Sequence, residues 1–308
     1  MRGHRDGGAG SNSSDPAVPA TRLTRFSAAG SEYLAVATQL LQDIRRDHPH
    51  AGVWEAADLQ WWWRSLRRTD AVSQSFWADT GGHAVGAAIR TDWNGTVAVD
   101  VIAHPALDAT NVNELWSAAI SLVAEERSVE SMVDVTDRVA ESHLTRAGLV
   151  DTGGRGISAW MDSPRSPKIA PLPAGYRLLD RAASDDGVHH MADRNGPDVE
   201  KRLNETSLYR TELDLLVVDQ SGAPAAYGLF WFDPVTAIGF VEPMGTLEDH
   251  RRKGLASHLL GTGLERLLMC GATRIKINYE VGNDPASALY LGMGFRPVTT
   301  TAMYVTPG

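Results

Sequence analysis

Apolar residues in the C-terminal half of the chain follow two different periods. The runs Leu213 to Asp219 and Ala225 to Phe232 are rich in β-branched and aromatic residues and are separated by a Gln-Ser-Gly turn, so they predict two strands. From Leu255 to Leu268, leucines recur with a period close to 3.6 residues, which predicts an amphipathic helix. In this half the predicted strands cover 176–179, 213–219, 225–232, 238–246, 274–279 and 295–305, the predicted helices cover 255–268 and 285–292, and 184–209 is polar and partly helical.

The N-terminal half repeats this order of elements with little obvious sequence identity. Its predicted strands cover 21–26, 73–78, 83–90, 96–103 and 131–135, with a closing pair over 149–161, and its predicted helices cover 32–46, 56–67, 113–124 and 140–147. A repeated order of elements indicates a duplicated domain. The predicted fold class is therefore α/β (α+β), with two similar domains, each a mixed, mostly antiparallel central sheet flanked by helices.

The clearest break in the pattern is the stretch from Ser163 to Gly175, which contains four prolines. Proline-rich segments of this kind form semi-rigid linkers. The first 19 residues are rich in Gly, Ser and Asp and predict a disordered tail. We therefore expect a tail over 1–19, a first domain over 20–162, a linker over 163–175 and a second domain over 176–308.

Composition narrows the possible partners and the compartment. The 308-residue chain carries a formal net charge of −9, which is atypical of general nucleic-acid or anionic-membrane binders and is compatible with cationic substrates such as amines. Its one cysteine, Cys270, allows no intramolecular disulfide and favours a reducing compartment. No apolar run approaches the ~18 residues of a membrane helix, and the N-terminus lacks the apolar core of a signal peptide. We expect a cytoplasmic protein without a metal, and its oligomeric state stays open.

One turn between a predicted strand and a predicted helix is suited to anions. The first amides of a helix have no intrahelical acceptor, and the helix dipole adds positive charge there. Gly254 permits close approach of a bulky anion, Ala256 is small, and three cations precede them. A solvated basic loop that leads into a helix would have the same composition. The turn reads Arg251-Arg252-Lys253-Gly254-Leu255-Ala256.

The context of this turn is more specific than the turn alone. The hexapeptide has the Arg-x-x-Gly-x-Ala form of the acyl-CoA signature in GCN5-related N-acetyltransferases (the GNAT superfamily), and three strands precede it, as in that superfamily. The pattern Asn283-x-x-Ala286-x-x-Leu289-Tyr290, followed by Gly294-Phe295, also matches the superfamily at the expected separation. The C-terminal half therefore resembles a GNAT domain, and the whole chain resembles the tandem-GNAT architecture.

The resemblance implies acetyl-CoA as acyl donor and a sheet that splays apart beside the signature helix. Pro243 fits such a strand, because proline has no amide proton to donate to a neighbouring strand. A simple β-bulge would accommodate Pro243 equally well. The implied contacts of the cofactor are Met244, Thr246 and Leu247 on this strand, Arg251, Arg252, Lys253, Gly254, Leu255 and Ala256 in the turn, and Asn283 and Tyr290 in the second motif. Asn283 could equally be a helix cap.

The resemblance also implies direct attack of an amine on the thioester. Tyr290 is the implied general acid, because a phenol of pKa ~10 can protonate a thiolate of pKa ~8.5 at a cost of about 2 kcal/mol. Packing on the signature helix is the alternative role. Glu242 is the candidate base, since burial could raise its pKa towards neutrality, although it could instead be solvated or paired with an arginine. Weaker candidates for the base are Glu280, Asp233, His189 and His190. Because His189 and His190 are adjacent, their side chains would point in different directions from one helix.

The N-terminal half lacks the anion-binding pattern. Its equivalent turn, His104 to Val112, has no glycine, and Asp108 would repel a diphosphate. We expect this domain to have lost cofactor binding and to be structural or to shape the acceptor cleft. Trp61, Trp62 and Trp63 could line such a cleft, although packing in the core is the favoured interpretation.

These observations predict an acetyl-CoA-dependent N-acetyltransferase that acts on a primary amine of a small molecule, such as an antibiotic, an amino sugar or a metabolite. The alternatives are a non-catalytic acyl-CoA-binding sensor or scaffold and a protein N-acetyltransferase. Retention of both Gly254 and Tyr290 favours an enzyme over a sensor.

Overall fold

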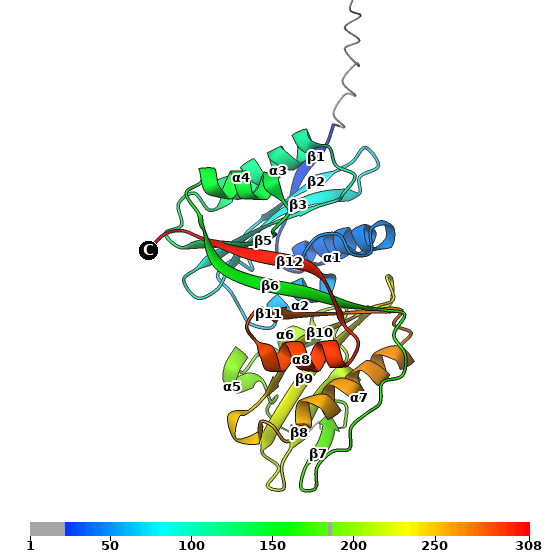
Figure 1. Cartoon of the computed structure of the whole chain (residues 1–308). Coiled ribbons are helices and arrows are strands. Elements are labelled where there is room, and N and C mark those ends of the chain that lie inside the picture. Colours follow the sequence, from blue (N-terminus) through cyan, green and yellow to red (C-terminus); the bar gives the residue numbers. More distant parts are fainter. Residues whose placement is uncertain (1–21, 184–186) are drawn as a thin grey trace, which may run out of the picture.

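The structure, a computed structural model, describes residues 22–183 and 187–308. The predicted tail over 1–19 and residues 184–186 lie outside this range. Within the described residues, the strands form one twelve-stranded sheet (Figure 1). We call residues 22–162 the N-terminal half and residues 163–308 the C-terminal half.

Each half contributes six strands. The strands are β1 (Thr24–Ala28), β2 (Gln74–Ala78), β3 (Ala84–Asp92), β4 (Val97–Ala103), β5 (Val129–Asp134), β6 (Val150–Asp162), β7 (Arg177–Asp180), β8 (Asp214–Val218), β9 (Pro224–Asp233), β10 (Ile238–Thr246), β11 (Arg274–Glu280) and β12 (Arg296–Val305). The helices are α1 (Gly30–Asp47), α2 (Ala56–Trp62), α3 (Ala109–Leu122), α4 (Arg138–Arg146), α5 (Ala192–Asn195), α6 (Val199–Asn204), α7 (Leu255–Met269) and α8 (Asp284–Gly292), with short 3-10 turns at Thr211–Leu213 and Glu248–His250.

The order of strands across the sheet is nearly symmetric. It runs β1-β2-β3-β4-β5-β12-β6-β11-β10-β9-β8-β7, and only the pairs β4–β5 and β10–β11 are parallel. The last strand of each half therefore pairs with the fifth strand of the other half, so β12 lies beside β5 and β6 lies beside β11. The two central strands cross the middle of the molecule in Figure 1. The predicted fold class, mixed and mostly antiparallel strands flanked by helices, is confirmed. The prediction gave each half its own sheet, whereas the exchanged pairing of β6 and β12 joins the strands of both halves into one sheet.

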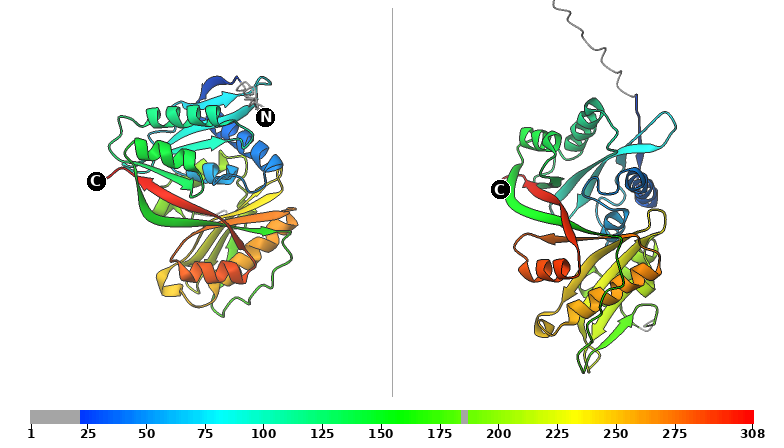
Figure 2. Two further views of the ribbon diagram at one scale, coloured as in Figure 1. Left: turned by 45° about the horizontal axis from the view of Figure 1, so that its top comes forward. Right: turned by 45° about the vertical axis from the view of Figure 1, so that its right-hand side comes forward.

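Three apolar cores hold the helices on this sheet. Helices α3 and α4 pack on the strands of the N-terminal half, and α7 and α8 pack on those of the C-terminal half. The third core joins α1 and α2 to residues of both halves, including Phe76, Leu203 and Trp231. Figure 2 shows α1 and α2 between the two halves in both views. None of the helices in the described ranges combines the length and apolar character needed to span a membrane.

Two predicted elements differ from the structure. The segment 149–161 was expected to be a closing pair, but it is the single long strand β6, because it pairs with β12 along one edge and with β11 along the other. The helix expected over 56–67 ends at Trp62.

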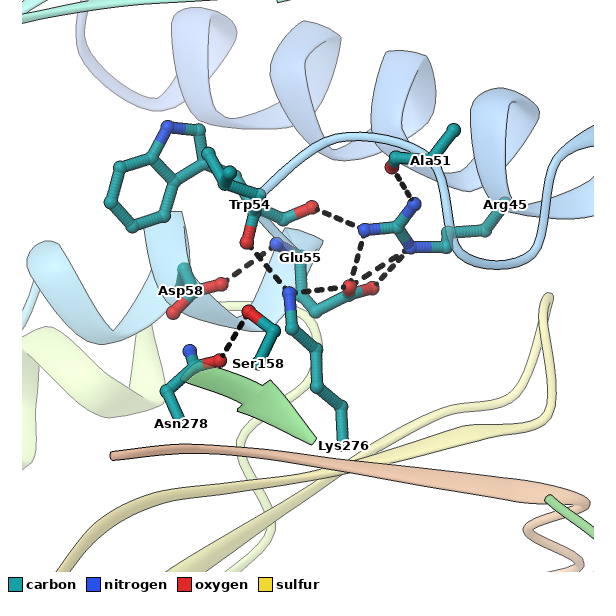
Figure 3. Close-up of polar contacts among 9 residues, drawn as sticks. Arg45, Ala51, Trp54, Glu55, Asp58, Ser158, Lys276 and Asn278 are labelled. Carbon is teal, nitrogen blue, oxygen red and sulfur yellow. Dashed lines mark hydrogen bonds and ion pairs between the residues drawn. The ribbon is translucent and has the colours of Figure 1, made fainter. Parts of the chain in front are cut away.

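A buried ion cluster ties α1 and α2 to the C-terminal half (Figure 3). The Lys276 ammonium on β11 donates to Glu55 Oε1 at 3.1 Å and to the carbonyl of Val53 at 2.6 Å. The Arg45 guanidinium on α1 bonds both carboxylate oxygens of Glu55, with Nε to Oε2 at 2.8 Å, and also holds the carbonyls of Ala51 and Trp54. The side chains of Lys276, Arg45 and Glu55 are only 0%, 2% and 5% exposed.

The charges of this cluster keep Glu55 ionised. Burial alone would raise the pKa of Glu55, but the charges and hydrogen bonds of Arg45 and Lys276 outweigh it and hold the pKa below its usual value. The backbone amide of Glu55 in turn donates to Asp58 Oδ2 at 2.7 Å at the start of α2. The cluster therefore fixes the segment from Ala51 to Asp58 against the sheet.

Substitution Glu55→Gln removes the only anion of this cluster and leaves two buried cations unpaired. Breaking a buried ion pair in this way costs about 3–5 kcal/mol. We expect the urea midpoint of unfolding to fall accordingly, while Glu141→Gln, which removes the exposed partner of Arg138, leaves it nearly unchanged. Equal midpoints for the Glu55 variant and the parent protein would contradict this role.

Candidate active site

A cavity of about 660 Å³ lies between the two halves. Its walls come from α2 and the segment before it, from β4, β5, β6 and β12, and from β10, β11 and α8. Both α2 and the preceding segment are held in place by the Lys276 cluster. The side chains of the cavity wall with polar or aromatic groups include Trp54, Asp58, Trp62, Arg64, Trp93, Asp100, Glu130, Arg194, Tyr227, Glu242, Asn278, Tyr279, Glu280, Asn283 and Tyr290.

The cavity opens where β10 and β11 separate. These parallel strands pair only from Ile238 to Val241, opposite Arg274 to Ile277. Beyond Val241, β10 continues to pair with β9 alone, after a bulge that contains Glu242 and Pro243. The indole of Trp231 donates to the carbonyl of Glu242 at 2.7 Å and anchors the bulge. The predicted splaying of the sheet at Pro243 is therefore present, and the bulge accompanies it.

Glu242 and Tyr290 both line this cavity, and the charge of Glu242 affects the ionisation of Tyr290. Burial, with help from the charge of Asp58, raises the pKa of Glu242 to about 7, although Arg64 acts in the opposite direction. Burial and the charge of Glu242 together raise the pKa of Tyr290 to about 12. At neutral pH the carboxyl of Glu242 is close to half ionised, and the Tyr290 hydroxyl keeps its proton.

The turn before α7 has the geometry of an anion site. Gly254 precedes the helix with φ +81°, and a Cβ added there would meet nothing within 4 Å, so the backbone is open to a ligand. The amides of Leu255, Ala256 and Ser257 have no intrahelical acceptor. Lys253 is held by the Tyr176 hydroxyl at 3.1 Å and the Asp249 carbonyl at 3.0 Å, and Arg251 Nε lies 3.4 Å from the Thr246 carbonyl.

The remaining predicted residues divide into two groups. Met244 and Asn283 line the cavity with Glu242 and Tyr290, whereas Leu247 is exposed near the turn. Asn283 is the N-cap of α8 and accepts from the Ala286 amide at 3.3 Å, as its capping alternative predicted. Among the weaker candidates, Glu280 lines the cavity, but Asp233 is buried elsewhere and accepts a hydrogen bond from Gln42 at 3.0 Å.

The prediction that His189 and His190 point apart on one helix is wrong. They precede α5 in an irregular segment, and their rings stack with centroids 4.6 Å apart. Their Nε2 atoms approach Asp214 at 2.8 and 3.4 Å, a spacing that could suit a metal ion. However, the Met191 amide donates to His189 Nδ1, so Nε2 carries the proton and donates to Asp214. This tautomer leaves His189 Nε2 without the lone pair that a metal needs.

Three carboxylates of the cavity were missed from the sequence: Asp58, Asp100 and Glu130. Burial raises the pKa of Asp58 to about 7, against the charge of Lys276. Burial and the charge of Glu130 raise the pKa of Asp100 to about 8, against a hydrogen bond from Trp54. Asp100 is the one charged residue in the apolar run 97–103, and that isolated charge was the available signal.

The tryptophans are divided between core and cavity. Trp63 is buried in the core, with the Arg202 guanidinium 3.7 Å from its ring. Trp61 is buried in the same core and also lines the cavity, as does the partly buried Trp62. The favoured interpretation of core packing therefore holds for Trp61 and Trp63 and is incomplete for Trp62.

The corresponding turn in the N-terminal half is closed to anions by its own side chain. Asp108 is the N-cap of α3, and its carboxylate accepts from the Asn111 amide at 2.9 Å. A carboxylate therefore already occupies the helix terminus where a diphosphate would bind.

Residues 177–295 match the acetyltransferase (GNAT) family model. The chain is 36% identical over 77 residues to a mycothiol acetyltransferase of Corynebacterium aurimucosum, a match that spans 24% of this chain and only 25% of that protein. It is 24% identical over 241 residues to a mycothiol acetyltransferase of Clavibacter michiganensis subsp. michiganensis, covering 73% of this chain and 77% of that protein.

Two solved structures share the fold over nearly their whole length. A tandem GNAT protein from the clavulanic acid biosynthesis pathway aligns with a TM-score of 0.64 and 19% identity, over 92% of this chain and 98% of that one. A GCN5-related N-acetyltransferase from Sphaerobacter thermophilus aligns with a TM-score of 0.61 and 16% identity, over 93% and 96%.

Substitution Asp100→Asn tests the electrostatics of the cavity. A carboxyl whose pKa is raised by folding holds a proton that the unfolded chain releases above pH ~4, so its contribution to stability falls as pH rises towards about 8. The slope is about 1.4 kcal/mol per pH unit for one proton. Asparagine cannot ionise. The melting temperature of the variant minus that of the parent should therefore be larger at pH 8 than at pH 5. The exposed control Glu125→Gln should show no such gain, and an Asp100 variant that behaves like this control would refute the raised pKa.

Proposed function

We propose that this chain, whose residues 177–295 match the acetyltransferase (GNAT) family model, transfers an acetyl group from acetyl-CoA to a primary amine of a small molecule. The acyltransferase activity, the acceptor and the residues of the site all belong to this proposal. The observation that carries it is a single cavity that joins Glu242 and Tyr290 at the point where β10 and β11 separate. The names of the two mycothiol acetyltransferase relatives support an acceptor of small size.

The turn before α7 supports the placement of the donor. The free amides of Leu255 and Ala256, the open backbone at Gly254 and the cations Arg251 and Arg252 would hold the pyrophosphate. From Met244 to Thr246, β10 pairs with β9 but no longer with β11, and the edge that β11 leaves would hold the pantetheine arm. Asp108 closes the equivalent turn of the N-terminal half, so we propose one donor site in the chain.

Acetyl-CoA supplies the acetyl group as a thioester. The amine nitrogen forms a bond to the carbonyl carbon, the carbon–sulfur bond breaks, and the nitrogen must lose a proton. Glu242 is the proposed base, acting directly or through water, and its pKa of about 7 suits proton transfer at neutral pH.

Tyr290 is the proposed donor of a proton to the leaving sulfur. With a pKa of about 12, against ~8.5 for a thiol, the transfer costs about 5 kcal/mol, which is more than an unperturbed tyrosine would require. The charge of Glu242 causes part of this rise. When Glu242 accepts the proton of the amine, that charge is neutralised, so the base step makes Tyr290 a stronger acid.

Arg251→Glu should weaken acetyl-CoA binding by at least about tenfold, because it replaces an attractive charge beside the pyrophosphate with a repulsive one. Isothermal titration calorimetry measures the affinity. Arg146→Glu, an equivalent reversal at an exposed site on α4, is the matched control. Unchanged affinity in the Arg251 variant would show that the donor binds elsewhere.

The pH profile of kcat/KM tests the base. Glu242 acts in its ionised form, so activity should fall as pH drops below about 7. Glu242→Gln should lower kcat by ~10²–10⁴-fold and remove this acid limb. Thiol release from acetyl-CoA with a panel of amines is the assay. If the fall in activity at low pH persists in Glu242→Gln and disappears in Glu280→Gln, Glu280 is the base instead. If acetyl-CoA binds but releases no thiol with any amine of the panel, the protein is a sensor rather than an enzyme.

A further inference from the structure

The N-terminal half contains a second opening in the sheet that reaches the same cavity. Parallel strands β4 and β5 pair only at Val97 with Val129 and at Ala98 with Glu130. Asp100 lies two residues beyond the last paired residue of β4, and both Asp100 and Glu130 line the cavity. This opening is the counterpart of the separation of β10 and β11 that carries Glu242.

Asp100 and Glu130 at this opening lack positive partners, whereas the charges of Lys276 and Arg45 act on the neighbouring Asp58. Asp100 is only 3% exposed, and the charges that act on it come from Glu130 and Asp58, both negative. Among the described residues, none of these three carboxylates forms an ion pair with a lysine, arginine or histidine. A hydrogen bond from Trp54 reaches Asp100, and the Glu55 amide reaches Asp58. A buried carboxylate without a cation is costly, so its presence in a cavity points to a ligand that supplies the cation.

Indole rings surround the same part of the cavity. Trp54 and Trp62 meet edge to face with centroids 4.8 Å apart, and Trp62 and Trp93 do so at 5.7 Å. All three line the cavity wall, but the guanidinium groups of Arg67 and Arg64 already lie 4.2 and 6.0 Å from the Trp93 ring, which leaves Trp54 and Trp62 for a ligand. Tryptophan faces beside carboxylates are the side chains that bind an ammonium group most favourably. The aromatic wall is a second observation, independent of the acidic groups, and it points to the same kind of ligand.

The guanidinium groups near the cavity lie beside Trp93 and Glu242 rather than beside Asp100. The charge of Arg64 lowers the pKa of Glu242, and the charge of Arg194 lowers the pKa of Arg64. Neither arginine contributes to the pKa shift of Asp100. Both have partners: Arg64 stacks on Trp61 at 4.0 Å and bonds Asn195, and Arg194 lies over Tyr227 at 5.1 Å. The charge of Asp58 raises the pKa of both Glu242 and Asp100, so Asp58 lies between the two ends of the cavity.

We propose that Asp100 and Glu130, with Trp54 and Trp62, bind a second cationic group of the acceptor, so that the preferred acceptor is a diamine or polyamine rather than a monoamine. This inference rests on the proposed function, in which the reacting amine lies at Glu242. The acceptor then spans the cavity past Asp58, with one nitrogen at each opening of the sheet. The N-terminal half supplies specificity in place of a second donor site.

Matched acceptors test this proposal in the full chain. The probes are butylamine, 4-amino-1-butanol and 1,4-diaminobutane, with longer diaminoalkanes to find the span. We expect kcat/KM for the best diamine to exceed that of the monoamine of equal length by about tenfold or more. In Asp100→Asn the ratio of the two values should fall towards one, and in the remote control Glu125→Gln the ratio should stay as in the parent. A parent ratio near one at every chain length overturns the proposal.

Binding measurements separate this proposal from the proposed function. Titration calorimetry at pH 6.5 in buffers of different ionisation enthalpy should show tighter binding of the diamine than of the monoamine, with release of protons from the cavity carboxyls. Tighter diamine binding without acetylation of any amine would support the cation site and contradict the acetyltransferase proposal. Equal affinities for the two amines, whether or not they are acetylated, would overturn the cation site.

Discussion

The ion cluster of Lys276, Glu55 and Arg45 is the interaction on which the rest of the site depends. It joins β11 of the C-terminal half to α1 and to the start of α2, in a place that water does not reach. Two cations share one carboxylate, so removal of Glu55 would leave both buried cations without their anion. The cluster thereby holds Trp54 and Asp58 at the cavity wall, directly opposite the strands that carry Glu242.

The crossing of β6 and β12 has a similar consequence for function. Because each of these strands pairs with the other half, the two halves form one sheet, and the cavity between them has walls with fixed relative positions. Each half also opens its sheet at one parallel pair, and each opening carries a carboxylate, the partly buried Glu242 in one and the buried Asp100 in the other. In the proposed function, the two halves thereby form one site with two chemically different ends.

Local features of the site could be predicted from the sequence. The turn before α7 depends on Gly254 and on a helix that starts beside it, and Pro243 marks a strand that departs from regular pairing. Both follow from the backbone properties of single residues. Lys276 and the carboxylate at Asp58 could not be predicted in the same way, because their partners are distant in the chain and only the folded sheet brings them together.

Where prediction failed, long-range contacts decided the structure. The segment 149–161 has the composition of a hairpin, yet β11 and β12 offer it a partner on each side. His189 and His190 would diverge on a helix, but Asp214 attracts both rings from the next strand. The sequence shows that Asp100 is the only charged residue in an apolar strand, but it does not show the cavity that this side chain lines.

In the proposed function, donor and acceptor meet in the cavity between the halves, between Glu242 and Tyr290. A crystal structure of the protein with bound CoA tests this meeting point most directly. We expect electron density for the pyrophosphate at the amides of Leu255 and Ala256 and for the thiol inside the cavity beside Tyr290. A thiol that ends outside this cavity, or a second CoA at the turn capped by Asp108, would contradict it.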